Sequence, residues 1–190
     1  MDLGTEWLKD ARREFRKSRA LAEKALAQVP PERWRERLDP SAPEGSNSLA
    51  VLMQHLAGNL RSRWTDFLST DGEKPDRRRD EEFEDPAADD PAAVRARWDD
   101  GWARLFTTLD SLTAADLGRT VTIRGEPHTV AQAIQRQLTH YAYHAGQIVF
   151  LAKHLSGPSW KPLSIPRGRS RQFDVTKEGA SYLPGKQGGA

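Results

Sequence analysis

The sequence predicts an all-α protein, an irregular four-helix bundle with an extended C-terminal tail. Three observations predict this fold class. Apolar residues recur every three or four positions in four separate segments, and prolines, glycines and helix-capping residues stand between those segments. The 190 residues also suit one domain. We therefore expect a single domain over residues 1–175 and a flexible C-terminus over residues 176–190.

The first two helices follow from apolar spacing and from their ends. The first is predicted over residues 5–28, where one face carries Trp7, Ala11, Phe15, Ala22 and Leu26. Two prolines, Pro30 and Pro31, end it. After a loop over residues 40–45, either Asn47 or Ser48 can cap a second helix over residues 48–68.

Residues 70–91 contain three prolines and no apolar period, which predicts a long charged loop. In it, Arg77, Arg78 and Arg79 are followed directly by Asp80, Glu81 and Glu82. We interpret this run as a solvated segment whose charges neutralise one another; the alternative is a lid that binds an anion. Loops of this length are often functional, so this loop or the C-terminal tail is expected to close over a site.

The remaining helices have clear start signals. Asp90 and Pro91 suit an N-cap and a first turn, so a third helix is predicted from there to about residue 112. Residues 121–128 form either a short β-hairpin or an extended connection. Thr129 and Gln132 have the spacing of a capping box, and the fourth helix runs to Ser156. The tail is expected to pack partly through Trp160, Leu163, Ile165 and Phe173.

Composition narrows the functional classes. The chain has no cysteine, which excludes disulfides, thiolate zinc sites and a cysteine nucleophile of its own. No apolar stretch is long enough to span a bilayer and the first residues lack a secretory signal, so we expect a cytoplasmic protein without membrane contact. The net charge is only +2, and no one-sided basic face with interleaved aromatics is evident, which argues against nucleic-acid binding.

Three histidines predict a metal site. His140 and His144 lie four residues apart, so their side chains project from one helix face and can reach the same ion. A pair at this spacing also occurs as an ordinary polar pair. His55 adds weight because it stands in the apolar run Leu52-Met53-Gln54-His55-Leu56, where an unpartnered imidazole is costly. We predict that the three converge on one divalent ion.

Other polar residues have candidate roles around that ion. Asn59 lies one turn after His55 and either orients that ring, contacts a metal-bound water or bonds a neighbouring helix. Gln147 is a second candidate for such a supporting role, and Arg63 and Arg78 are candidates for binding substrate. His128 and His154 are interpreted as structural, and Trp64, Trp98 and Trp102 as packing residues. No zinc-protease, di-iron or phosphate-loop motif is present.

His55 followed by His140-x-x-x-His144 resembles the DinB/YfiT-like metalloprotein superfamily. The segments MQHLAGNLRSRWTDFLSTDGEKP, RRRDEEF, HYAYHAGQIVFLAKHLSG and WKPLSIPRGRSRQF resemble a bacterial branch known only as a domain of unknown function. The resemblance implies a four-helix bundle, often dimeric, with three histidines holding nickel, zinc or a similar ion. Some members transfer low-molecular-weight thiols, but the TDGEKP loop and SIPRG tail set this chain apart, so no substrate is implied.

Three neutral imidazoles leave a coordination position open, which is typical of catalytic rather than structural zinc. We therefore expect a metal-dependent enzyme acting on a small molecule, either as a thiol S-transferase or as a hydrolase. The absence of cysteine slightly favours a thiol brought by the substrate. The alternative is a non-enzymatic metal-binding stress or interaction module.

Overall fold

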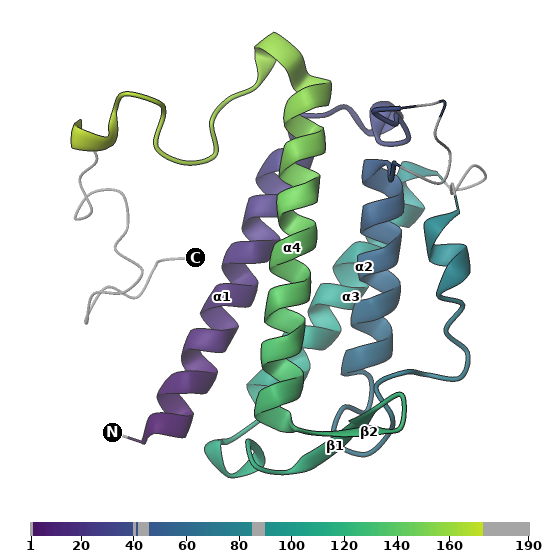
Figure 1. Ribbon diagram of the computed structural model, residues 1–190, viewed down its shortest axis with the longest axis vertical. Coiled ribbons are helices and arrows are strands. Elements are labelled where there is room, and N and C mark those ends of the chain that lie inside the picture. Colours follow the sequence, from purple (N-terminus) through teal and green to yellow (C-terminus); the bar gives the residue numbers. More distant parts are fainter. Residues whose placement is uncertain (1, 40, 42–45, 85–89, 173–190) are drawn as a thin grey trace.

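A computed structural model describes residues 2–39, 41, 46–84 and 90–172. In this part of the chain, four α-helices form a bundle with a short antiparallel hairpin at one end (Figure 1). The elements are α1 (Leu3–Leu26), α2 (Leu49–Trp64), α3 (Pro91–Ser111), β1 (Thr120–Ile123), β2 (Glu126–Thr129) and α4 (Val130–Ser156). The predicted fold class is confirmed. No described helix is both long and apolar enough to cross a membrane.

The helix ends follow the capping signals. The side chains of Ser48, Asp90 and Thr129 accept hydrogen bonds from the first turns of α2, α3 and α4, and Gln132 completes the capping box of α4. Only α2 ends well before its predicted limit of residue 68. Thr65 is extended and Asp66 has a φ of 48°, so the helix stops there, although Phe67 is still buried and had prolonged the apolar pattern.

The helices form two parallel pairs. In the first pair, α2 and α3 run in the same direction. Gly101 of α3 packs against Leu60 of α2, and one to two turns further along both helices the Thr108 hydroxyl donates to the carbonyl of Trp64. In the second pair, Phe15 of α1 lies 5.8 Å from Tyr141 of α4, and Ser156 at the end of α4 bonds the carbonyl of Gln28.

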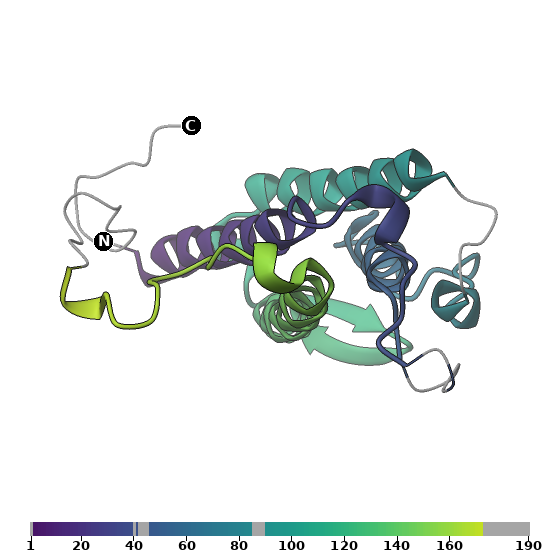
Figure 2. The same cartoon turned by 90° about the horizontal axis from the view of Figure 1, so that it is seen from above.

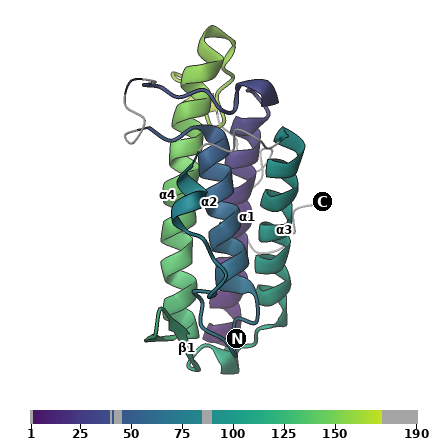
Figure 3. The same ribbon diagram turned by 90° about the vertical axis from the view of Figure 1, so that its right-hand side faces the viewer.

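Because α2 and α3 are parallel, the segment between them must return along the whole length of α2. It does so on the outside of the bundle (Figure 3). Near the hairpin, Gly72 donates its backbone N–H to the carbonyl of Thr122, and at the other end of α2, Gln54 donates to the carbonyl of Glu81. The segment includes the 3₁₀ turn η2 (Asp80–Phe83), which packs on α2. The topology of the bundle therefore accounts for the long connection.

The core lies between the helices and is rich in aromatic side chains. Trp64, Trp98 and Trp102 are almost fully buried, as their interpretation as packing residues requires. The indole N–H of Trp64 donates to the hydroxyl of Tyr141, which donates in turn to the side-chain oxygen of Asn59. This chain of hydrogen bonds joins α2 to α4.

The hairpin is present and is fixed to the returning segment through Asp71. Its turn residues Arg124 and Gly125 both have positive φ, as a tight hairpin turn requires, and both donate their backbone N–H to the Asp71 carboxylate at 2.8 Å. Glu73 donates a third backbone N–H. Burial alone would raise the pKa of Asp71, but these donors lower it to about 2.

We expect Asp71→Asn to lower the free energy of unfolding by about 1–3 kcal/mol at neutral pH, because an amide cannot accept all of these charge-assisted bonds. The folded-state pKa lies below the ordinary value of 3.8. The contribution of the Asp71 carboxylate to the free energy of unfolding is therefore complete above about pH 4 and is lost as the pH falls toward 2. Urea unfolding of the parent and the variant at pH 7 and at pH 2–3 measures the size of this contribution and its loss in acid. Asp76→Asn is the control, since Asp76 pairs with Arg61 at the exposed surface. Equal losses from both variants would contradict this account.

The described part of the tail leaves α4 on the side away from α2 (Figure 2). Lys161 exchanges hydrogen bonds with the side chain of Gln28, and Trp160 and Leu163 pack against the core. Ile165 is exposed, contrary to the predicted packing, because the chain has by then left the bundle. Phe173 and residues 176–190 lie outside the described residues, so the domain limit at residue 175 stays a prediction.

Candidate metal centre

Three imidazoles meet between α2 and α4, as predicted. The Nε2 atom of His140 lies 3.0 Å from that of His144 and 3.4 Å from that of His55. His55 and His144 are buried, and the candidate ligand atoms of all three residues lie within 4.8 Å of one another. Residues 85 positions apart in the sequence are thus brought into one cluster.

Two of the three nitrogen–nitrogen spacings fit a divalent transition metal. Nitrogens that share one ion at about 2.0–2.1 Å stand roughly 2.9–3.4 Å apart for angles near 90–110°. The two Nε2–Nε2 distances match this range. Among the described residues, no cysteine, carboxylate or fourth histidine joins the cluster. Three nitrogen ligands are therefore available, which leaves at least one coordination position for a small molecule.

Hydrogen bonds at the other ring nitrogens orient two of the three candidate ligands. The Nδ1–H of His55 donates to the Glu82 carboxylate at 2.9 Å, and the Nδ1–H of His144 donates to the side-chain oxygen of Gln147 at 2.7 Å. Because carboxylate and amide oxygens accept these bonds, the Nε2 atoms keep their lone pairs for the ion. Gln147 thus lies beside His144, and its supporting role stays a prediction.

The site keeps two of its rings neutral. Burial, followed by the nearby imidazoles of His144 and His55, lowers the pKa of His140 to about 3. Burial and the proximity of His55 lower the pKa of His144 to about 4. Both rings are therefore unprotonated at neutral pH, which is the state that binds a metal ion.

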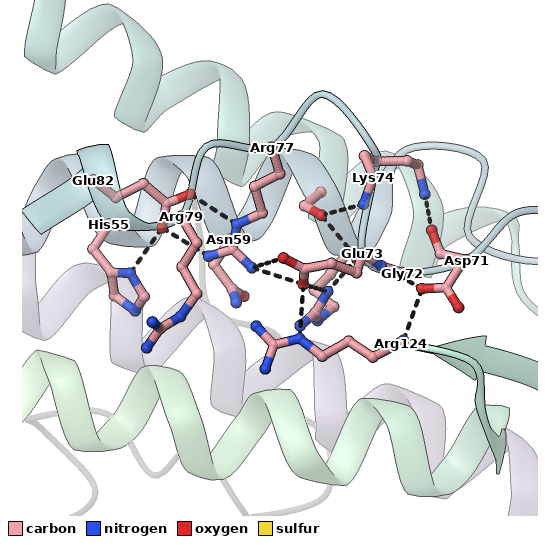
Figure 4. A network of polar contacts seen from close by, with 12 residues as sticks. His55, Asn59, Asp71, Gly72, Glu73, Lys74, Arg77, Arg79, Glu82 and Arg124 are labelled. Carbon is pink, nitrogen blue, oxygen red and sulfur yellow. Dashed lines mark hydrogen bonds and ion pairs between the residues drawn. The ribbon is translucent and has the colours of Figure 1, made fainter.

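The interpretation of residues 77–82 as a solvated run is wrong for Arg77 and Glu82. Their side chains are only 3% and 8% exposed, and Arg77 binds both carboxylate oxygens of Glu82 at 2.8 and 2.7 Å. Arg77 also contacts Glu73, which pairs with Arg63 at 2.8 Å (Figure 4). Two arginines and two glutamates therefore form a buried network that ends on the metal-ligand candidate His55.

This network explains the charge state of Glu82. Burial raises the pKa of its carboxyl, but the hydrogen bonds from Arg77 and His55 outweigh burial and lower it overall. The carboxylate stays ionised and accepts from His55, an arrangement known to orient metal-bound histidines. Phe83, which follows Glu82 directly, packs its ring 4.5 Å from the His55 ring.

A glycine makes room for this carboxylate. A Cβ atom built on Gly58, one turn after His55 on α2, would stand 2.6 Å from the Glu82 Cδ and closer still to Oε1. No real side chain tolerates such a contact without displacement. Gly58 therefore lets η2 lie close enough to α2 for Glu82 to reach His55.

The other predicted residues take different places. Asn59 accepts from Tyr141 of α4, which is the bond to a neighbouring helix that was one of its three predicted alternatives. Arg63 is buried and binds Glu73 and the carbonyl of Gly72, whereas Arg78 is exposed and pairs with Glu81. His128 bonds the carbonyl of Glu126, outside the cluster. Of the two segments expected to close over the site, the returning segment lies against it and the described tail does not.

Comparison with known proteins identifies a family but no activity. The model of a family described as "Protein of unknown function (DUF1572)" matches residues 2–169. Neither the curated proteins nor the solved structures give a match.

Proposed function

Since the chain belongs to the DUF1572 family, whose description assigns no activity, we propose its function from the centre itself: a divalent-metal-dependent enzyme that acts on a small molecule. The observation that carries the proposal is the convergence of three Nε2 atoms, from His55, His140 and His144, with no further protein ligand among the described residues. An incomplete ligand set is the mark of metal sites that bind and activate a substrate.

Membership of the DinB/YfiT-like superfamily is part of this proposal. The order of ligands, one histidine on the second helix and a pair four residues apart on the fourth, supports it. On this basis we propose nickel or zinc as the ion and a homodimer as the assembly. His55, His140 and His144 are proposed as the ligands and Gln147 as a supporting residue.

The chemistry follows from the donor set. An ion held by three neutral imidazoles supplies a Lewis acid that activates either water or a thiol. Glu82 and Gln147 hold the ligand rings of His55 and His144 in their metal-binding orientation. The chain has no cysteine, so in a transfer reaction the thiol must come from the substrate. The reaction is thus proposed to be thiol transfer to an electrophilic carbon or hydrolysis.

A non-enzymatic metal-binding module is the second candidate. One observation favours it: the three histidines join α2 of one parallel helix pair to α4 of the other. An ion at this position would tie the two pairs together whether or not it reacts.

Metal loading is expected to stabilise the protein, because the ion binds the folded arrangement and not the separated helices. At free metal 100-fold above the dissociation constant, the gain is about 2.7 kcal/mol, or roughly 5–10 °C in Tm for a chain of this size. Protein purified without an affinity tag is analysed for bound elements, stripped, reloaded and melted. The prediction would be contradicted if a sample shown to contain the metal had the same Tm as the stripped sample.

Turnover decides between the two candidates. The loaded protein is tested against thiol-plus-electrophile pairs and esters, and the stripped protein serves as the control. Turnover that is lost when the metal is removed and returns when the metal is restored supports the proposal of an enzyme. A loaded protein inactive across the panel would favour the module.

A further inference from the structure

A groove beside the metal centre has an unusual lining. It encloses about 460 Å³ on the outer side of α4, next to the start of α2, and this volume falls within the range of small-molecule sites. None of its lining residues carries a charge, in a chain of which 29% is charged. They are Leu38, Ser46, Asn47, Leu52, Tyr143, Gly146, Gln147, Phe150 and Leu151.

The groove shares side chains with the metal centre. Gln147, which lines the groove, accepts the hydrogen bond from His144 Nδ1 and donates to the hydroxyl of Tyr143. The ring of Tyr143, also in the lining, lies 4.8 Å from the ring of His144. The groove therefore lies next to the centre, one side chain away from His144 and on the side of its Nδ1 atom.

The groove also leaves apolar surface exposed. Phe150 is 67% and Tyr143 60% exposed, and Leu38 is 40% exposed, which makes them three of the most exposed large hydrophobic side chains among the described residues. Clustered exposed apolar residues mark binding surfaces more often than scattered ones do. A volume of about 460 Å³ suits a small molecule.

A larger groove of about 710 Å³ between α2, α3 and η2 carries less information. Six of its charged side chains pair with one another, Arg77 with Glu82, Arg78 with Glu81 and Arg61 with Asp76. The groove therefore gives little indication of the chemistry of a ligand.

We propose that the uncharged groove binds the apolar portion, an aromatic ring or a short acyl chain, of the molecule that reacts at the three histidines. The inference rests on the proposed metal function and specifies its substrate class. Gly146 forms the open floor of the groove, since a Cβ atom built there meets no other atom within 4 Å. A larger side chain at this position would therefore occupy the groove without a clash at its base.

The test uses three metal-binding probes with the same head group. Acetohydroxamate, benzohydroxamate and 4-carboxybenzohydroxamate are titrated into the cobalt-loaded full chain, and binding is followed in the cobalt absorption spectrum. The affinity of each probe for the protein is divided by its affinity for the free ion. On this scale we expect benzohydroxamate to bind roughly 10- to 100-fold more tightly than acetohydroxamate, because its ring is transferred from water into the groove. The added carboxylate is expected to remove this advantage.

Two matched variants locate the effect. Gly146→Leu, which fills the groove, is expected to lower benzohydroxamate affinity at least fivefold and to leave acetohydroxamate unchanged. Ala142→Leu, at an exposed position of α4 outside the lining, should change neither. Phe150→Ser, which removes one wall, provides an independent variant with the same expected direction as Gly146→Leu.

The outcomes separate the two proposals. A chain that binds none of cobalt, nickel and zinc would refute the metal function and this inference with it. A cobalt-loaded chain that binds acetohydroxamate but shows no preference for the ring would refute only the groove. If Gly146→Leu and Phe150→Ser instead convert a dimer to a monomer in sedimentation, with the probe ratio unchanged, the groove is an interface between two copies of the chain and the inference is overturned.

Discussion

Replacing His140 by alanine is expected to lower the affinity for zinc or nickel by roughly 10²- to 10⁴-fold, as the loss of one ligand in three implies for sites of about 10 kcal/mol. His140 is the central candidate ligand, since its Nε2 lies within 3.4 Å of the corresponding atoms of both His55 and His144. Any metal-dependent turnover should disappear with the ion. Equilibrium dialysis against a competing chelator measures the affinity.

The control for this variant is His154→Ala, an exposed histidine near the end of the same helix. It should leave affinity and turnover unchanged. The metal-free fold should survive His140→Ala, because His140 is only partly buried. Circular dichroism checks this. Parent-like metal affinity in His140→Ala would refute the assignment of the three histidines.

Gly58→Ala is expected to have the second-largest effect, because its methyl group would overlap the Glu82 carboxylate. The Glu82 side chain, or the segment that carries it, must then shift, which weakens the bonds of its carboxylate to His55 and Arg77. We expect a loss of roughly 3 kcal/mol in the free energy of unfolding and a 10- to 100-fold lower metal affinity. Urea unfolding and metal competition measure the two effects.

Gly146→Ala is the matched control, another glycine-to-alanine change within a helix but with open space around the new methyl group. It should be neutral or stabilise by up to about 1 kcal/mol. Glu82→Gln separates the contributions at the site, since it keeps the size of the side chain and removes its charge. If Gly58→Ala behaves like Gly146→Ala, Glu82 does not depend on the room that Gly58 provides.

Much of the fold could be predicted because the sequence signals for helix ends are local. Ser48, Asp90 and Thr129 identify the starts of α2, α3 and α4 from a few neighbouring residues. The end of α2 was predicted too late because buried Phe67 continues the apolar period after the backbone has left the helix at Thr65. Periodicity reports which residues are buried and not whether the chain between them is helical.

The candidate ligands were predictable for a related reason. His140 and His144 are one turn apart on one helix, and His55 stands in an apolar run that marks it as buried. Glu82 and Arg77 could not be found this way, since a mixed charged run has the same composition on the surface and in a buried network. Their burial depends on contacts with α2, about 20–30 residues away in sequence, which no local pattern records.

The parallel arrangement of α2 and α3 has a further consequence for how length changes would be tolerated. An antiparallel pair would need only a short turn, and its length could vary freely at the surface. Here the route from Trp64 to Pro91 passes over His55, so inserting or deleting residues before Glu82 would shift that carboxylate out of register with the ring. Changes after Phe83 would leave that register intact. The part of the connection before Glu82 should therefore tolerate insertions less well than the part after Phe83. The contact of Glu82 with His55 constrains the length of the first part, whereas the second part must only be long enough to join Phe83 to α3.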